Sequence, residues 1–279
     1  MTIIDVSSIA AGSSQVKVQF YYHDNDYWGW YWAVDDVELY VPEANDVKLN
    51  SVLWGSTGFW AERLAYYQVP TSQVTAIDFS GVVENIGAQD QQDAVFTATA
   101  GTFSSSSAAT PVLVGNIDTL ACNASFTPGS ATATLSLSGA VTMGNNDGDA
   151  TNNALANFAS IAINPYVYSR DNGTALSGSF NQGMGFEVGN IFDIFANTTI
   201  GGGSVYINGA AEVGTEMYLK LYSIDPVSGD FVYESESAPI ILATNNLNTN
   251  LVIELDPYVN VTAGTTYLAV VGSYTSGLK

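Results

Sequence analysis

Short runs in which apolar and polar residues alternate recur along this chain, and they constrain its fold more than any other feature. Near the start, Val16, Val18, Phe20 and Tyr22 occupy every second position. Because successive side chains of a β-strand leave on opposite faces, a period of two predicts a half-buried strand. Clusters of Asn, Asp, Gly and Pro separate the runs and favour turns. The pattern therefore predicts an all-β protein built from antiparallel strands.

A second run follows the polar residues 23–26 and carries three of the chain's five tryptophans. Trp28, Trp30 and Trp32 alternate with smaller neighbours, which predicts a strand whose ring-bearing face packs in a core. A sugar-stacking platform is the alternative for this stripe. The apolar phase then shifts by one residue at Asp35 and Asp36, and one extra residue in a strand indicates a β-bulge.

Residues 30–37 read WYWAVDDV, and residues 5–12 read DVSSIAAG. These two segments resemble the closing strands and the lead-in strand of the cleaved-adhesin or choice-of-anchor J module, a MAM-like jelly roll. A complete jelly roll needs roughly 100–150 residues. We therefore expect residues 1–41 to be the C-terminal strands of a truncated jelly-roll domain whose polypeptide begins upstream of Met1.

Residues 42–165 repeat the alternation in short strands separated by turn clusters, which predicts an antiparallel sandwich. Residues 82–87 (VVENIG) and 147–153 (DGDATNN) resemble a turn and the ending of bacterial Ig-like modules of the CARDB kind. The resemblance implies an Ig-like sandwich. The aromatic-rich segment Trp54–Gln73 departs from that module, and we expect it to cover a sandwich edge or to pack against a neighbouring domain.

Residues 166–279 form the third expected unit, which begins after Asn164-Pro165. Residues 168–173 (YSRDNG), 221–230 (LYSIDPVSGD) and 263–267 (AGTTY) resemble a jelly-roll-like module of large secreted bacterial proteins, similar to type nine secretion cargo. Asp225–Asp230 is in addition a strong hairpin-turn signal. The predicted fold class is thus all-β, with tandem antiparallel β-sandwiches: a partial jelly roll, an Ig-like sandwich and a jelly-roll-like sandwich.

The charge balance narrows the location and the partners of the chain. It carries 27 Asp and Glu against six Lys and Arg, a net charge of −21. Nucleic acid is a poor partner because phosphate binding needs clustered basic residues. No apolar run approaches the roughly 20 residues of a membrane helix, so we expect no membrane insertion. A lysine-poor acidic surface suits saline surroundings, which favours an extracellular or cell-surface location.

The residue inventory offers no histidine- or cysteine-based catalytic group. A carboxylate pair for glycoside hydrolysis stays open, but with 27 acidic residues any pair would fit, so the signal carries little weight. The only histidine, His23, lies in an expected turn, and Cys122 is the only cysteine. A Ser-His-Asp triad or a zinc site would need both a different inventory and a different spacing. We therefore expect a protein that is not an enzyme.

Calcium is the cofactor that the sequence favours, because loops readily supply the six to eight oxygen ligands that it takes. Asn145, Asp147, Asp149 and Thr151 occur at every second position, and Gly148 permits a tight bend. The spacing resembles the start of an EF-hand loop but lacks its closing glutamate. An Asx turn without metal is the alternative.

A second candidate calcium site surrounds the tryptophan run. Asp24, Asp26, Asp35 and Asp36 flank it, and the resemblance to the jelly-roll module implies calcium between strands near such acids. Strands outside residues 1–41 would have to supply further ligands.

The combined expectation is a non-catalytic extracellular segment of a larger secreted or cell-surface protein with an adhesive or structural role, stiffened by calcium and able to assemble into fibres by strand exchange. The expected partners are other copies of itself, neighbouring cell-surface proteins or surface glycans. Two alternatives stay open: an accessory tail of a secreted hydrolase such as a peptidase, and a carbohydrate-binding module.

Overall fold

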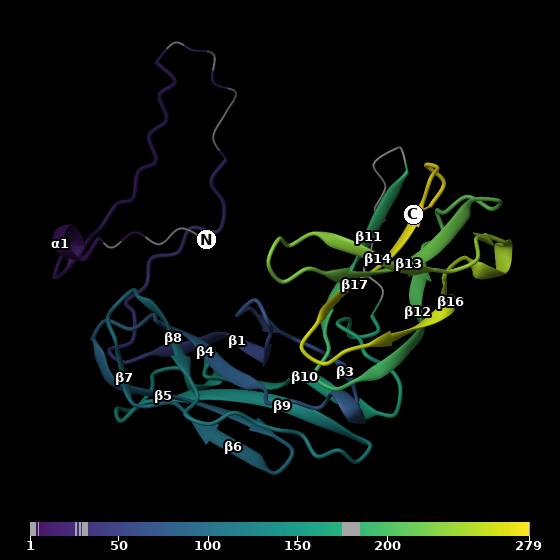
Figure 1. The fold of residues 1–279 in the computed structure, drawn as a ribbon. Coiled ribbons are helices and arrows are strands. Elements are labelled where there is room, and N and C mark those ends of the chain that lie inside the picture. Colours follow the sequence, from purple (N-terminus) through teal and green to yellow (C-terminus); the bar gives the residue numbers. More distant parts are fainter. Residues whose placement is uncertain are drawn as a thin grey trace. The chain divides into compact units, whose positions relative to one another are not determined.

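The computed structural model describes residues 4, 6–25, 27, 29, 33–174 and 185–278 and divides the chain into two units. The first unit is Met1–Val41 and the second is Pro42–Lys279. Each unit is described by itself below. Strands dominate the described residues of the second unit (Figure 1).

The first unit contains one short helix, α1 (Ser7–Ala10), and its described residues form no strand. The strand predicted over Val16–Tyr22 is therefore wrong for this structure, and no strand follows the expected bulge at Asp35 and Asp36 either, while Trp28, Trp30 and Trp32 lie outside the described residues. A strand needs ladder partners, and an isolated two-stranded hairpin is marginal in water. At the expected bulge, Asp36 adopts a left-handed φ of 52°, which turns the chain there.

The first sandwich of the second unit packs two sheets around one apolar core (Figure 1). It is an Ig-like β-sandwich, in which every strand pair is antiparallel except β3 with β10. One sheet has the order β2-β1-β4-β8 and the other β3-β10-β9-β5-β6, with β7 on β5. The strands are β1 (Val47–Thr57), β2 (Arg63–Leu64), β3 (Gln68–Pro70), β4 (Asp78–Asn85), β5 (Gln91–Ala100), β6 (Phe103–Ser106), β7 (Thr110–Val112), β8 (Ile117–Ala121), β9 (Ala133–Thr142) and β10 (Ala154–Asn164), with short 3₁₀ turns η1 (Thr71–Gln73) and η2 (Ala150–Asn152).

Phe96 lies at the centre of this core and explains two of its glycines. Its side chain is fully buried between the sheets. A Cβ added at Gly81 would lie 2.3 Å from the Phe96 ring, and one at Gly139 would lie 2.9 Å from it. The ring therefore fills space that only glycine leaves at these two positions, because interiors are close-packed.

The second sandwich is one sheet of order β11-β17-β13-β14-β16-β12, with β15 on β13. It folds over where β14 meets β16, a junction that rests on the single pair Glu236↔Asp256. Leu219 and Leu221 on one side then face Ile253 and Leu255 in a second apolar core. The strands are β11 (Phe186–Asp193), β12 (Thr198–Ile207), β13 (Glu216–Ile224), β14 (Phe231–Glu236), β15 (Ile240–Ile241), β16 (Thr249–Val261) and β17 (Thr266–Ser273), with η3 (Thr244–Asn246) before β16.

The turn predicted at Asp225–Asp230 is confirmed as the connection between β13 and β14. The Asp225 carboxylate accepts hydrogen bonds from the backbone N–H groups of Val227 and Ser228, each at 2.8 Å. These bonds hold the pKa of Asp225 below its ordinary value. Gly229 closes the turn with a φ of 76°, which favours glycine.

Across the described ranges, the structure has no helix that is both long and apolar enough to cross a membrane.

Candidate functional site

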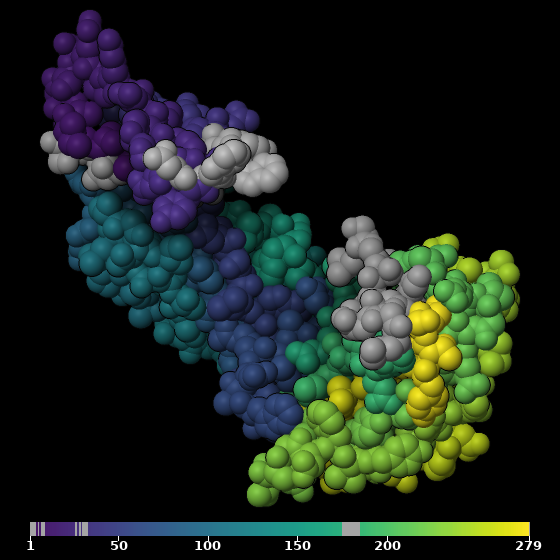
Figure 2. Space-filling view, turned by 90° about the horizontal axis from the view of Figure 1, so that it is seen from above, coloured from purple at the N-terminus to yellow at the C-terminus, as the bar shows by residue number. Residues whose placement is uncertain are grey.

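An aromatic stack joins the two sandwiches of the second unit, whose blue and green surfaces are in direct contact in Figure 2. The rings of Tyr66 and Tyr168 stack with centroids 4.3 Å apart, and Phe192 lies 5.4 Å from Tyr168. Tyr66 comes from the aromatic segment Trp54–Gln73, so part of that segment packs against the neighbouring sandwich. Tyr66 is only 3% exposed, which places the stack in an interior environment.

Polar groups inside the same contact are paired across it. The Asp193 N–H donates to the Tyr66 hydroxyl at 3.1 Å, and the Tyr168 hydroxyl donates to the Asp193 carbonyl at 3.2 Å. Burial raises the pKa of both phenols, so they remain neutral. A neutral hydroxyl can both donate and accept, which the two contacts with the Asp193 backbone require.

Gln73 extends this contact with a buried side-chain amide that is 1% exposed. Its Oε1 accepts from the N–H groups of Phe195 at 2.9 Å and Ala196 at 3.3 Å, and its Nε2 donates to the Ala196 carbonyl at 2.8 Å. The Gln73 amide thus forms the hydrogen bonds with the backbone of the β11–β12 connection that a neighbouring strand would otherwise form. We call the contacts of Tyr66 and Gln73 with Tyr168, Phe192, Asp193, Phe195 and Ala196 the joint.

Asp193 is the one acidic side chain of the joint, and it is 98% buried, with 2% of its surface exposed. Its Oδ1 accepts from the Thr266 hydroxyl at 2.7 Å. Its Oδ2 is buried and has no hydrogen-bond partner among the described residues. Burying a carboxylate oxygen without a partner is costly, so this atom requires an explanation.

A small cavity of about 30 Å³ adjoins Asp193. The first sandwich contributes Glu62 and Trp60 to its wall, and the second contributes Arg170. The Arg170 Nη1 donates to the Ile191 carbonyl at 2.8 Å, and the guanidinium lies 5.4 Å from the centre of the Tyr66 ring. The complete lining is Gly58, Trp60, Glu62, Leu64, Arg170, Ile191, Asp193 and Thr266.

In the loop predicted to bind calcium, the acids accept local hydrogen bonds. Asp147 accepts from the N–H of Val47 at 3.3 Å and of Asp149 at 2.9 Å. Asp149 accepts from the N–H of Thr151 at 3.0 Å and from its hydroxyl. Asn145 donates elsewhere, to the Gln91 side chain at 3.3 Å. The predicted residues Asp147, Asp149 and Thr151 are thus linked to one another, and the Asx-turn geometry of the alternative is present.

Residues that spacing did not reveal lie beside this loop. Asp46, 7% exposed, accepts from the Asn152 amide at 3.1 Å. Burial raises the pKa of Asp46, and the negative charges of Asp147, Asp149 and Glu43 raise it further. The side-chain oxygens of Asn152 and Asn153 are buried and have no hydrogen-bond partner in the described part of the chain. Asp46 precedes Asn152 by 106 positions, so no local pattern could have shown their proximity.

The second predicted calcium site remains a prediction. Asp24 accepts from the Gly29 N–H at 3.1 Å, and Asp35 accepts from the Asp36 N–H at 2.9 Å. Asp26 lies outside the described residues. Over the described ranges of both units, no three His, Cys, Asp or Glu side chains come together as a metal-holding group.

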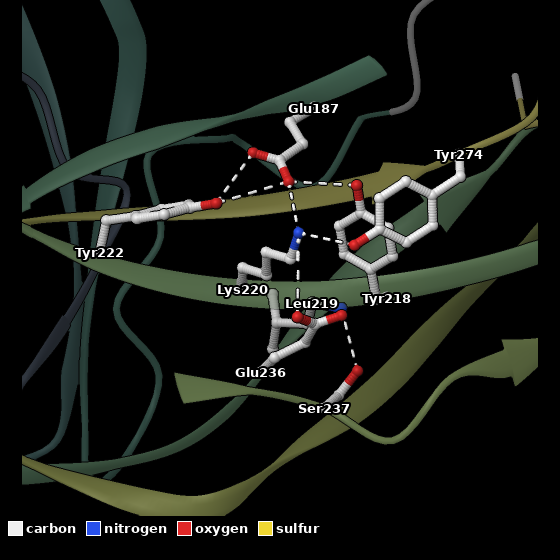
Figure 3. Close-up of polar contacts among 8 residues, drawn as sticks. All are labelled: Glu187, Tyr218, Leu219, Lys220, Tyr222, Glu236, Ser237 and Tyr274. Atoms are coloured by element: carbon white, nitrogen blue, oxygen red, sulfur yellow. Dashed lines mark hydrogen bonds and ion pairs between the residues drawn. The ribbon is translucent and has the colours of Figure 1, made fainter. Parts of the chain in front are cut away.

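A polar and aromatic cluster lies on the outer face of the second sandwich (Figure 3). The Lys220 ammonium contacts Glu187 at 2.8 Å, Glu236 at 3.8 Å and the Tyr274 hydroxyl at 3.1 Å. Gly272 pairs with both Glu187 and Tyr218 on neighbouring strands, and a Cβ there would lie 2.8 Å from the Tyr218 ring. The glycine therefore leaves the space in which the Tyr218 ring lies, and the hydroxyl of that ring meets Glu187 at 3.1 Å.

The protonation states of this cluster limit its chemistry. Burial works to raise the pKa of Glu187, but hydrogen bonds from Lys220, Tyr218 and Tyr222 outweigh it and leave the pKa below its ordinary value. Burial works to lower the pKa of Lys220, but Glu187 and Tyr274 outweigh it and leave that pKa raised. The lysine stays protonated and the glutamate ionised near neutral pH. The cluster therefore braces β11, β13 and β14 as an ion pair and presents neither a free base nor a nucleophile.

Comparisons with known proteins add little. No protein-family model matches the chain, and no curated protein matches it. Among solved structures, it is similar to the CARDB domain of a Pyrococcus furiosus protein in complex with di-metal ions, at 11% identity and a TM-score of 0.30. The match covers 47% of this chain and 98% of that domain.

Proposed function

We propose that the chain is a non-catalytic structural or adhesive segment of a larger extracellular or cell-surface protein. Its role is to hold sandwich modules at a fixed spacing while their surfaces contact other copies, neighbouring surface proteins or glycans. The joint is the observation that supports this proposal. Contacts between domains of one chain are by default small, polar and mobile, whereas Tyr66 and Gln73 are 3% and 1% exposed and are hydrogen-bonded to the other sandwich.

The surface charge agrees with this role. A net charge of −21 with six basic residues keeps a chain dispersed in salty surroundings, where screening limits its self-repulsion. Rigid spacing and a highly charged surface are both useful to a segment that extends from a cell or a filament.

A distance measurement between spin labels tests whether the joint is rigid. Cysteines introduced at Thr102 and Val227, both exposed, would carry nitroxides in a Cys122→Ala background. Pulsed dipolar spectroscopy should give one narrow distance distribution. It should broaden in Gln73→Ala and stay narrow in the control Asp147→Asn. A parent distribution as broad as that of two modules on a flexible linker would overturn the proposal.

Calcium remains part of this proposal at residues 145–153. The side-chain oxygens of Asn152 and Asn153, which have no partner among the described residues and lie beside Asp46 and Asp147, are the hard donors that calcium prefers. Isothermal titration with CaCl₂ should detect binding that Asp46→Asn weakens. Equal calcium affinities of the parent and of Asp46→Asn would contradict a calcium site in this loop and would favour an Asx turn without metal.

A second candidate function is assembly by strand exchange, which one sheet edge favours. β14 pairs with β13 from Phe231 to Glu236 but with β16 only at Glu236. Phe231, Val232 and Tyr233 are exposed beside this edge. The segment Val16–Tyr22 has the alternation of a strand, is not itself a strand in the structure, and carries a lysine that suits the acidic β14. Sedimentation over a concentration series should show association that Gln19→Pro abolishes; a parent chain that stays monomeric excludes this function.

A further inference from the structure

We propose that the outer face of the second sandwich is a glycan-binding surface, on which a neutral oligosaccharide lies along β13. The inference deepens the adhesive function proposed above and rests on it, because it names one ligand class and one surface. The residues of this surface belong neither to the joint, nor to the loop at residues 145–153, nor to the tryptophan run near the start of the chain.

The strand pairing places aromatic side chains at both ends of this face. Tyr218 and Tyr222 are four positions apart in β13, so they leave the same side of the strand and stand roughly 13 Å apart along it. On β14, Tyr233 is the register partner of Tyr222, and their ring centroids are 6.3 Å apart. At the other end, the Tyr274 ring lies 4.8 Å from that of Tyr218. Figure 3 shows Tyr222 at one end of the cluster and Tyr218 with Tyr274 at the other.

The outer rings at both ends are open to solvent. Tyr233 is 57% exposed and Tyr274 is 68% exposed. Phe231 lies two positions before Tyr233 and is 60% exposed, and its ring centroid is 6.3 Å from that of Tyr222. Single exposed apolar side chains are ordinary, but several that gather on one sheet face mark a binding surface.

Charged groups between the two aromatic ends keep unused hydrogen-bonding capacity. The Glu236 carboxylate lies 3.8 Å from the Lys220 ammonium and accepts no hydrogen bond within the described ranges. The Glu187 Oε2 accepts one bond, from the Tyr222 hydroxyl at 3.1 Å, although a carboxylate oxygen has two lone pairs. The Tyr274 hydroxyl accepts from Lys220, and its own proton has no acceptor among the described residues.

This composition fits a saccharide better than a protein partner. The C–H faces of a pyranose ring are apolar and pack on aromatic rings, while its hydroxyls donate to carboxylates and accept from an ammonium. A protein partner would instead bury the Lys220–Glu187 ion pair and the Glu236 carboxylate, at a desolvation cost. The net charge of −21 disfavours an acidic polysaccharide. The distance between the two aromatic ends exceeds one sugar ring, so the ligand that fits is a neutral oligosaccharide.

Isothermal titration of the full chain tests this surface. The probes are neutral hexasaccharides of glucose, mannose and N-acetylglucosamine, with oligogalacturonate as the acidic comparison. At least one neutral hexasaccharide should bind, and Tyr233→Ala and Tyr274→Ala should each weaken its binding by about tenfold, because each variant lacks one stacking ring. Both positions are exposed, so the variants should fold as the parent does. The matched control is Tyr206→Ala, at a 42% exposed position on β12, the opposite edge strand of the same sheet.

Glu236→Gln tests the polar part of the surface. The amide oxygen still accepts a hydrogen bond, with about half the strength of the carboxylate, so this variant should weaken binding less than Tyr233→Ala does. Amide chemical shifts report the position of the ligand independently of affinity. On addition of the bound hexasaccharide, the amides of Tyr222 and Gly272 should shift, and that of Tyr206 should not.

Three results would overturn the proposal. The first is that no neutral hexasaccharide binds at millimolar concentration, and the second is binding that Tyr233→Ala and Tyr274→Ala leave unchanged. The third is a preference for oligogalacturonate over every neutral probe. Self-association that Tyr233→Ala abolishes, in the absence of saccharide binding, would assign the face to a second copy of the chain instead.

The spin-label distances separate this inference from the function on which it rests. Narrow distances without saccharide binding would retain the rigid spacer and reject the glycan surface. Broad distances together with Tyr233-dependent binding would reject the spacer and retain the surface. Narrow distances together with Tyr233-dependent binding would support both.

Discussion

The joint and the loop at residues 145–153 both gather carboxyl and amide groups, yet they do so in opposite ways. In the loop, Asp147 and Asp149 accept from N–H groups two positions further along the chain. In the joint, Tyr66 meets Asp193 across 127 positions and Gln73 meets Ala196 across 123. Evenly spaced acids thus identify local turn contacts, whereas the contacts that fix one sandwich on another come from isolated residues.

Burial adds a second difference between the two regions. Asp149 is exposed and Asp147 is half-buried, so a hydrogen bond to either carboxylate largely replaces one to water. In the joint, Tyr66, Gln73 and Asp193 are buried, so that removal of one partner leaves the other with little water to replace it. Substitutions in the joint should therefore cost more than substitutions in the loop, and the following predictions test that ranking.

Tyr66→Ala should have the largest effect, a loss of about 3–5 kcal/mol in the free energy of unfolding. The change removes a ring that stacks on Tyr168 and leaves the buried Asp193 N–H without its acceptor. Urea denaturation of the full chain measures the loss. Tyr166→Ala, at a position that is 90% exposed, is the control and should change stability by less than about 0.5 kcal/mol. Equal losses in the two variants would show that the joint adds nothing to stability.

Gln73→Ala should lower the free energy of unfolding by about 2–3 kcal/mol, because it leaves backbone groups of Phe195 and Ala196 without partners at the joint. The exposed Gln89→Ala is the matched control. Hydrogen exchange should locate the effect, with faster exchange of the Phe195 and Ala196 amides in the variant. Unchanged exchange at these two amides would contradict the role assigned to Gln73.

The sequence predicted features that depend on neighbours in the chain and missed contacts between residues far apart in it. Period-two runs predicted the antiparallel sandwiches, and Asp225–Asp230 predicted its hairpin, because both patterns depend on neighbours in the chain. The strands expected over Val16–Tyr22 did not form, since alternation indicates a face but supplies no ladder partner.

The key residues of the joint could not be identified from the sequence. The aromatic segment Trp54–Gln73 indicated packing against a neighbour, but Gln73 carries no mark that separates it from a surface glutamine. Asp193 likewise ends an ordinary apolar run, and only the folded structure brings Gly58 and Arg170 beside it. Neither could be identified before the two sandwiches were placed together.

Asp147→Ala tests the contribution of the loop at residues 145–153 and should lower the free energy of unfolding by about 1 kcal/mol. The change removes acceptors for the Val47 and Asp149 N–H groups and for the Asn153 amide. Urea denaturation compares it with Asn146→Ala, an exposed neighbour that should be nearly neutral. A loss as large as that of Gln73→Ala would break the ranking and would indicate that the loop does more than turn the chain.

The smallest expected effect is a pH dependence of the folding stability, which has opposite signs for the neighbouring acids Asp149 and Asp46. Hydrogen bonds from Thr151 hold the pKa of Asp149 below its ordinary value, so its stabilising effect is present above about pH 4 and is lost as the pH falls through the folded-state pKa. Burial and neighbouring charges raise the pKa of Asp46, so its ionised form opposes folding at pH 7, and that penalty disappears as the pH falls toward 4. At pH 7, Asp149→Asn should therefore lower the denaturation midpoint and Asp46→Asn should raise it.

Both differences should shrink at pH 3, where the parent acids take up protons. The exposed Asp230→Asn is the control at both pH values. Shifts of the same sign for Asp46→Asn and Asp149→Asn at pH 7 would mean that burial does not separate the two acids. In that case the loop would have to be treated as one surface cluster, and the contrast with the joint would rest on the Tyr66 and Gln73 variants alone.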